Sequence, residues 1–227
     1  MENANNESQS LNILVVGATG GTGRATVELL AARGHRVTAF SRSAHKLDDL
    51  PGRIRRLSGD ATRSDDVEEA VRGQDAVIVI LGISENPLRV RTLGPSRTPV
   101  DVRSQGTRNV IAAMRKHGVA RLAVQSSFGV GDTRQELRFL DRLFFKLILK
   151  PQIADTEVQE ELVRDSGLDW VLVQPVHLTN HEFENEAFTS TAGAVRSFKV
   201  ARKAVADFLA GPALEPTYHH QSVAISG

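Results

Sequence analysis

The stretch that decides the fold is LNILVVGATGGTGRATVELLAARG, residues 11–34. Its first part, Leu11–Val16, is an apolar run rich in β-branched residues, which is typical of a buried strand. Its last part places Val27, Leu30 and Ala31 on one face of a helix, and Gly34 stands where a helix C-cap is expected. The stretch therefore predicts a strand, a glycine-rich turn and a helix in direct succession.

The turn itself, GATGGTG, has the glycine spacing GxxGxxG. Gly17 permits a tight turn, Gly20 lets a ligand approach the backbone, and Gly23 lets the helix start close against the strand. The helix N-terminus then offers free N–H groups and the positive end of its dipole to phosphate. Between a strand and a helix, this spacing predicts a site for the pyrophosphate of a dinucleotide.

The rest of the chain alternates apolar runs with helical patterns. Further strands are expected over Val37–Phe40, Ile54–Leu57, Asp75–Gly82, Arg121–Ser127, Asp169–Pro175 and Ser222–Ser226. Helices are expected from Val102 to a stop at Gly118, around Val158 and Leu162, and over Arg202–Leu209. In the middle one, Val158 and Leu162 mark the apolar side and Glu157, Glu160, Glu161 and Arg164 the other. This alternation predicts an α/β fold with a parallel sheet between two helix layers.

Composition narrows the class of protein. The chain has 227 residues, of which 41% are apolar and 24% charged, as expected for one globular domain. The 28 Lys and Arg balance 27 Asp and Glu, so no nucleic-acid or membrane partner is expected. With no cysteine, disulfides, thiolate nucleophiles and cysteine-ligated metals are excluded. Residues 1–10 lack a signal-peptide pattern and are expected to form a disordered tail before a domain at 11–227, in a cytoplasmic protein.

The end of the second strand indicates which dinucleotide is bound. An acidic residue there favours NAD, but this sequence reads AFSRSAHK, with Arg42 and no acid nearby. Arginine suits a 2′-phosphate, Ser41 and Ser43 add donors, and Arg24 is a second possible cation. The sequence therefore predicts a preference for NADP (NADPH), with NAD as a possible second cofactor.

Taken together, these motifs resemble the atypical short-chain dehydrogenase/reductase group, the small NAD(P)H-binding or NmrA-like proteins. Within that group the chain resembles the flavin reductase/biliverdin reductase B type. The stretches that carry the resemblance are GATGGTG, GDATRSDDVEEAVRGQDAVIVILG, GTRNVIAAMRKHGV, VQSSFGVGD and RDSGLDWVLVQP. They cover nearly all of Leu11–Pro175. The resemblance implies a single Rossmann-like, doubly wound domain with strand order 3-2-1-4-5-6 and a small C-terminal substrate region.

The resemblance also assigns positions along the cofactor. It places Asp60 at the adenine amino group with Ala61 beside it, although Asp60 also suits a turn or helix cap. Leu81 and Gly82 match the segment passing the adenine ribose, and Pro175 and Val176 the segment beside the nicotinamide. The full set of expected cofactor-binding residues is Gly17, Thr19, Gly20, Gly21, Thr22, Gly23, Arg42, Asp60, Ala61, Leu81, Gly82, Pro175 and Val176.

One departure from the group concerns its proton donor. Classical members use a Tyr-x-x-x-Lys pair, in which the tyrosine protonates a carbonyl oxygen. By register these two positions fall at Gln152 and Thr156, and the chain's one tyrosine is Tyr218 near the C-terminus. Ordinary ketone reduction is therefore not expected. Flavins, quinones and bilins accept hydride at a conjugated centre and take their proton from water, so they need mainly a cofactor and an open pocket.

Two residues are the candidates for catalysis. Ser127 ends the fifth strand and matches the group's active-site serine, although a strand-end serine also bonds to backbone. His177 follows the sixth strand on the expected substrate side, where it is either a proton donor or an ordinary surface histidine. His181 lies four positions further on, but no third ligand is evident and no metal is expected.

Two long loops are expected to shape the substrate pocket. Ser84–Thr98 carries Arg89, Arg91 and Arg97, which suit either an anionic acceptor or solvent. Thr133–Ile153 is basic and aromatic, and its phenylalanines have the spacing of a packed helix or lid. Both follow the carboxyl ends of strands, where open α/β sheets bind ligands.

Three functions remain open from the sequence. The first is an NADPH-dependent oxidoreductase, monomeric or homodimeric, that reduces a small conjugated acceptor of flavin, quinone or bilin type. The second is a non-catalytic NADP(H)-sensing regulator of the NmrA type. The third is an epimerase, dehydratase or pathway reductase with an unrecognised proton donor.

Overall fold

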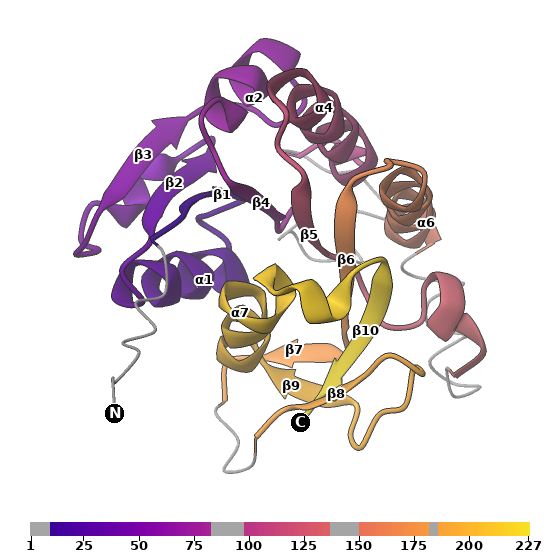
Figure 1. The fold of residues 1–227 in the computed structure, drawn as a ribbon. Helices are drawn as coiled ribbons and strands as arrows, with labels where there is room; N and C mark the ends of the chain where they lie inside the picture. Colours follow the sequence, from indigo (N-terminus) through magenta and orange to yellow (C-terminus); the bar gives the residue numbers. More distant parts are fainter. Residues whose placement is uncertain (1–9, 83–97, 137–149, 182–185) are drawn as a thin grey trace, which may run out of the picture.

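The structure is a computed structural model, and it describes residues 10–82, 98–136, 150–181 and 186–227. A central sheet has the strand order β3-β2-β1-β4-β5-β6-β10-β8 (Figure 1). Its strands are β1 (Asn12–Val16), β2 (Arg36–Ser41), β3 (Ile54–Ser58), β4 (Ala76–Val79), β5 (Arg121–Gln125), β6 (Asp169–Pro175), β8 (Phe188–Ser190) and β10 (Gln221–Ser226). The described helices are α1 (Gly21–Ala32), α2 (Ser64–Val71), α4 (Val102–His117), α6 (Lys150–Arg164) and α7 (Arg202–Ala210).

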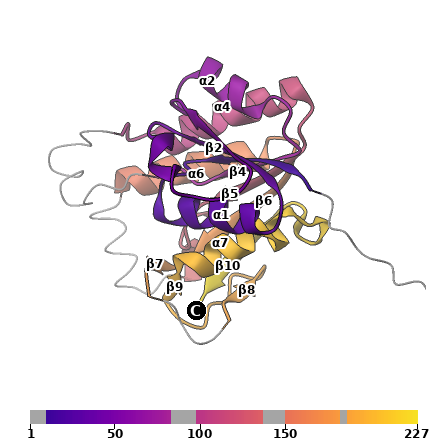
Figure 2. The same ribbon diagram turned by 90° about the vertical axis from the view of Figure 1, so that its left-hand side faces the viewer.

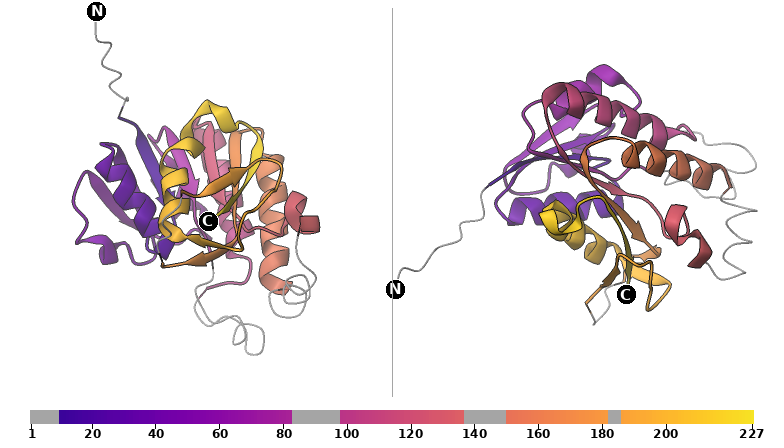
Figure 3. Two further views of the ribbon diagram at one scale, coloured as in Figure 1. Left: turned by 90° about the horizontal axis from the view of Figure 1, so that it is seen from below. Right: turned by 45° about the vertical axis from the view of Figure 1, so that its right-hand side comes forward.

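The pairing confirms the order 3-2-1-4-5-6 that the resemblance implies. All pairs from β3 to β10 are parallel, and β8 joins β10 antiparallel at the edge. A second, two-stranded sheet pairs β7 (His177–Thr179) with β9 (Lys199–Ala201). These late strands gather around the C-terminus (Figure 3), and they form the expected small C-terminal region.

Helices cover both faces of the sheet, with α2 and α4 on one side and α1 and α7 on the other (Figure 2). On β1 the fully buried residues alternate: Leu14 and Val16 face the cluster with α2 and α4, and Ile13 and Val15 face the one with α1 and α7. Burial on both faces explains why the central strands are almost continuously apolar in sequence. No helix in the described ranges is long and apolar enough to cross a membrane.

The structure corrects the expected face of α6. Val158, expected on the apolar side, is 41% exposed, whereas Glu160, expected on the polar side, is fully buried. Glu160 of α6 faces the sheet and accepts hydrogen bonds from Ser126 and Gln174 at the ends of β5 and β6, so apolar spacing assigned it to the wrong side. The helix also begins at Lys150, so the end of the expected loop at 133–153 is its first turn, and a short 3-10 helix, η2 (Gly131–Glu136), covers the loop's start.

Candidate functional site

The glycine turn between β1 and α1 is closed by contacts that only glycine permits. Gly17 has φ +86°, and a Cβ there would lie 2.3 Å from the Ile80 carbonyl oxygen. A Cβ on Gly23 would lie 2.3 Å from the Gly17 carbonyl oxygen. The N–H groups of Gly17 and Ala18 both donate to the Phe40 oxygen, at 3.0 and 3.2 Å. The turn is thereby fixed against the ends of β2 and β4.

The N-terminus of α1 is left open by this turn. Gly20 is the extended N-cap, no side chain caps the helix, and its first turn holds no acidic residue. A Cβ on Gly20 would meet nothing closer than 3.5 Å, so packing within the turn does not require a glycine here. The lack of a side chain instead leaves space on the outer side of the turn. Thr19 is half-buried, Thr22 is buried, and Gly20 and Gly21 are exposed. The first N–H groups of a helix have no intrahelical partner, so this end suits a phosphate.

An arginine from α7, which the sequence analysis missed, lies across this helix end. A Cβ on Gly21 would lie 2.8 Å from Cδ and 3.1 Å from Nε of Arg202. The Arg202 guanidinium donates through Nη1 to Asn180 Oδ1 at 2.6 Å. The C-terminal region is therefore in contact with the glycine turn although the two are far apart in sequence.

At the end of β2, Arg42 is exposed and donates through Nη2 to Thr98 Oγ1 at 2.8 Å. Ser41 is buried, and its Oγ accepts the N–H of Ser43 at 3.2 Å. Arg42 thus stands at the expected edge of the site, on the strand next to β1.

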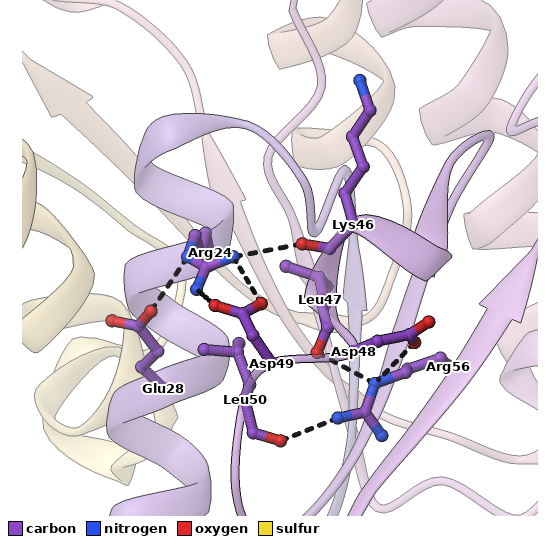
Figure 4. A network of polar contacts seen from close by, with 8 residues as sticks. All are labelled: Arg24, Glu28, Lys46, Leu47, Asp48, Asp49, Leu50 and Arg56. Atoms are coloured by element: carbon purple, nitrogen blue, oxygen red, sulfur yellow. Dashed lines mark hydrogen bonds and ion pairs between the residues drawn. The ribbon is translucent and has the colours of Figure 1, made fainter.

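Arg24, the second possible cation for the cofactor, is bound by carboxylates of its own chain in this structure. Its guanidinium binds both carboxylate oxygens of Asp49, at 3.1 and 2.5 Å, and Glu28 at 3.0 Å (Figure 4). It also donates to the Lys46 carbonyl oxygen at 3.1 Å. The hydrogen bond from Arg24 lowers the pKa of the Asp49 carboxyl. Arg24 therefore holds α1 against the segment after β2, with its charge already opposed by two carboxylates.

The expected adenine side lies between β3 and α2. Asp60 Oδ1 accepts both the N–H and the hydroxyl of Thr62 at 2.9 Å, so one carboxylate oxygen closes an Asx turn. Ala61 is buried, and its oxygen accepts Asn109 Nδ2 from α4 at 2.9 Å. A Cβ on Gly106 of α4 would lie 2.5 Å from Cδ1 of Leu81, so α4 packs directly on the end of β4, just before Gly82.

Ser127, Pro175 and Val176 come together at the carboxyl ends of β5 and β6. The N–H of Ser126 donates to Val173 at 2.8 Å and that of Phe128 donates to Pro175 at 3.0 Å, which fixes the segment holding Ser127. Ser127 is half-buried, and its hydroxyl bonds to the Phe128 oxygen at 3.3 Å. The position of this serine at the ligand-binding edge is therefore set by β6.

His177 lies beyond these residues, at the start of β7. Its side chain is exposed, and its backbone N–H donates to Phe198 at 3.2 Å. No side-chain hydrogen bond of His177 joins it to another part of the chain that the structure describes. The structure therefore gives no contact between His177 and Ser127.

Behind Ser127 lies a buried polar cluster that the sequence analysis did not identify. Glu160 accepts hydrogen bonds from the Ser126 hydroxyl, from Gln174 Nε2 at 2.9 Å and from Arg164 Nη2 at 2.9 Å. The one signal for it is Gln174, a polar residue within the apolar run DWVLVQP. This cluster joins α6 to the ends of β5 and β6.

The two positions that the resemblance assigns to tyrosine and lysine hold Gln152 and Thr156. Thr156 is buried and bonds to the Gln152 carbonyl oxygen at 2.8 Å. Tyr218 packs against Phe208 of α7 at a ring-centroid distance of 5.1 Å, on a cavity of about 540 Å³ that none of the expected site residues lines. Within the described ranges no three His, Cys, Asp or Glu side chains are grouped to hold a metal ion. Arg89, Arg91, Arg97 and most of both long loops lie outside the described residues.

Comparison with known proteins follows this geometry. The sequence model of a family described as NAD(P)H-binding matches residues 17–216. An uncharacterised chloroplast protein of Arabidopsis thaliana is 30% identical over 78% of this chain and 62% of its own length. The 2-alkyl-3-oxoalkanoate reductase of Stenotrophomonas maltophilia is 35% identical over 52% of this chain and 33% of its own length. The chain thus spans less than two thirds of these curated relatives.

Solved structures show the same fold. The anaerobilin reductase ChuY of Escherichia coli O157:H7 superposes with a TM-score of 0.71 at 22% identity, covering 95% of this chain and 96% of that one. A short-chain dehydrogenase/reductase of Veillonella parvula in complex with NADP gives 0.74 at 18% identity, covering 96% and 95%. Because the family match runs from the glycine turn nearly to the last strand, the chain belongs to the NAD(P)H-binding family, with a Rossmann fold.

Proposed function

We propose that the protein is an NADPH-dependent reductase of small conjugated acceptors, of the flavin, quinone or bilin type. The observation that carries this proposal is the open N-terminus of α1 at the same sheet edge as Ser127, combined with Gln152 and Thr156 where the group has tyrosine and lysine. Bound NADPH supplies a hydride. An acceptor that takes hydride at a conjugated centre needs no tyrosine from the protein.

The residues of the chain then bind the dinucleotide and orient the acceptor beside it. The glycine turn and the first N–H groups of α1 hold phosphate, and Arg42 favours the 2′-phosphate of NADPH over the hydroxyl of NADH. Pro175 ends β6 and Val176 follows it, and the resemblance places both beside the nicotinamide. Ser127 donates a hydrogen bond to the acceptor, and His177, exposed on the adjoining β7, is the candidate proton donor.

The reductase similarities support this proposal at the level of the reaction class. Both a curated relative and a structural neighbour are reductases by name, and the latter is named an anaerobilin reductase. The second candidate is a regulator that binds NADP(H) without chemistry. It is favoured by one observation: Gln152 and Thr156 stand where the group has its catalytic tyrosine and lysine, and Tyr218 packs against Phe208 of α7.

Loss of reduced-nicotinamide absorbance tests the proposal. NADPH and NADH are compared against FMN, a quinone and a bilin, with Ser127→Ala beside the native chain. We expect turnover that prefers NADPH and falls in Ser127→Ala. Ser10→Ala is the matched control, because the Ser10 hydroxyl bonds to Gly34 at an exposed position outside the site. Tight NADPH binding with no acceptor reduced would contradict the reductase and favour the regulator.

A further inference from the structure

Arg103 is a half-buried cation whose side-chain hydrogen-bonding capacity is not used within the described part of the chain. It stands in the first turn of α4, and its Nη1 is buried without a hydrogen-bond partner. Burial lowers the pKa of this guanidinium, while the charge of Asp155 acts in the opposite direction. A buried donor with no partner is rare in native structures and destabilises the fold. Fold stability therefore does not explain why an arginine stands at this position.

Asp155 does not remove this deficit. Its two carboxylate oxygens accept backbone N–H groups instead, Oδ2 from Arg103 and Oδ1 from Ser104, each at 3.0 Å. Asp155 thus caps the N-terminus of α4 from the neighbouring α6. Its negative charge stabilises the charged form of Arg103, but its carboxylate oxygens accept no hydrogen bond from the guanidinium fork of Arg103.

The fork faces the expected cofactor edge. A Cβ on Gly82, just past β4, would lie 3.3 Å from Arg103 Nη2. One turn further along α4, on the same face, Gly106 packs so closely that a Cβ there would lie 2.5 Å from Leu81 and 3.2 Å from the Ala61 Cβ. Arg103 therefore projects from the helix face that touches the adenine side, one turn nearer the carboxyl edge of the sheet.

We propose that Arg103 binds the pyrophosphate of the dinucleotide from the end of β4, beside the glycine turn. An arginine guanidinium can donate two parallel hydrogen bonds to phosphate oxygens. The negative charge of the phosphate then compensates for the solvation that the guanidinium loses by burial. The 2′-phosphate belongs to the other edge, where Arg42 follows β2. Arg103 therefore contributes to the binding of NADPH and NADH alike, whereas Arg42 distinguishes between them.

Equilibrium binding to the full chain separates the two arginines. Titration calorimetry uses three ligands: NADPH, NADH and adenosine 2′-monophosphate, which has no pyrophosphate. Arg103→Met is expected to weaken the binding of NADPH and of NADH by the same factor, about 10- to 150-fold, because a charge-assisted contact is lost. It leaves the affinity for adenosine 2′-monophosphate unchanged. Arg42→Ala weakens the binding of NADPH and of adenosine 2′-monophosphate and leaves the affinity for NADH unchanged.

Two further variants separate binding from folding. Arg108→Met changes an exposed arginine on the same helix and is expected to bind all three ligands as the native chain does. Arg103→Lys keeps the charge but not the fork, so intermediate affinity is expected. Without ligand, Arg103→Met melts at or above the native temperature, because an apolar side chain replaces an unpartnered buried charge.

The proposal is overturned if Arg103→Met binds both dinucleotides within twofold of the native chain. It is also overturned if the ligand-free variant is strongly destabilised while Arg103→Lys binds NADH normally, since that marks a structural arginine. A rise in KM for the acceptor with unchanged NADPH affinity would assign the fork to the acceptor instead. The proposal rests on cofactor binding and not on turnover, so it stands even if no acceptor is reduced.

Discussion

The Ser126 hydroxyl donates a hydrogen bond to the carboxylate of Glu160, and both residues are buried. Ser126 immediately precedes the candidate catalytic Ser127, and Glu160 comes from the centre of α6. The same carboxylate accepts Gln174 from β6 and Arg164 from α6, which also contacts Ser222 of β10 at 3.3 Å. The ends of β5 and β6 are therefore joined to α6 by hydrogen bonds to one carboxylate, in addition to the apolar packing of the strands.

Glu160→Gln is expected to lower the free energy of unfolding by about 2 kcal/mol, because hydrogen bonds to a charged group are replaced by weaker ones and Arg164 loses its ion pair. The measurement is urea unfolding of the native and variant chains. Glu161→Gln, at the next and exposed position of α6, is the control, with a change within about 0.5 kcal/mol. Equal effects of the two substitutions would mean that the cluster contributes nothing.

Gly17 and Gly34 offer a matched pair for the glycine turn. Both have positive φ, +86° and +85°, but a Cβ on Gly17 meets the Ile80 oxygen at 2.3 Å while one on Gly34 meets nothing within 4 Å. Gly34→Ala is expected to cost about 1–2 kcal/mol for the backbone conformation alone. Gly17→Ala adds the backbone clash and is expected to cost about 3 kcal/mol or more. If thermal unfolding shows the same loss of stability for both variants, the turn relaxes enough to relieve the clash with the Ile80 oxygen.

The sequence predicts the first half of the fold well for a physical reason. In residues 11–34 the apolar run, the glycines and the helical face are contiguous, so local preferences and tertiary packing agree. The parallel arrangement follows because each central strand is buried on both faces and reads as an almost uninterrupted apolar run. The short α2 and the edge strand β8 were not predicted, since neither carries a long apolar pattern.

The polar contacts of the site depend on residues that are distant in sequence. Glu160 and Val158 exchange their expected environments because a hydrophobic pattern does not reveal that Ser126 and Gln174 are partners for a buried carboxylate. Arg202 meets Gly21 only through the packing of α7 beside α1. Nothing in the sequence shows that Arg24 binds the carboxylate of Asp49, whereas Arg42 donates to the hydroxyl of Thr98.

Arg42 is expected to set the preference between the two dinucleotides. With Arg42→Ala the affinity for NADPH relative to NADH falls about tenfold or more, because a charge-assisted contact to the 2′-phosphate is lost. The measurement is the ratio of the two dissociation constants. Arg24→Ala is the matched control: since Arg24 is bound to Asp49 and Glu28, its loss leaves that ratio unchanged. A ratio that shifts with Arg24 and not with Arg42 would reverse the assignment.

His35 is expected to make stability depend on pH near neutrality. Its Nδ1 accepts the N–H of Leu11 at 3.3 Å, which requires that nitrogen to be unprotonated. Burial, and then the charge of Arg33, lowers the pKa of His35 below its usual 6.5. The unfolded chain therefore binds more protons at this residue than the folded chain does once the pH falls below 6.5.

The contribution of His35 to stability is thus complete above its unfolded pKa and declines as the pH falls from there through the lowered folded pKa. His35→Gln keeps an acceptor for Leu11 but does not titrate. Urea unfolding of both chains from about pH 8 to about pH 5 is expected to give a constant difference in unfolding free energy above neutrality. Below it, the native chain loses stability relative to His35→Gln. A difference that stays flat over the whole range would show that folding does not change the pKa of His35. A difference that moves in favour of the native chain at low pH would show that folding raises this pKa instead of lowering it.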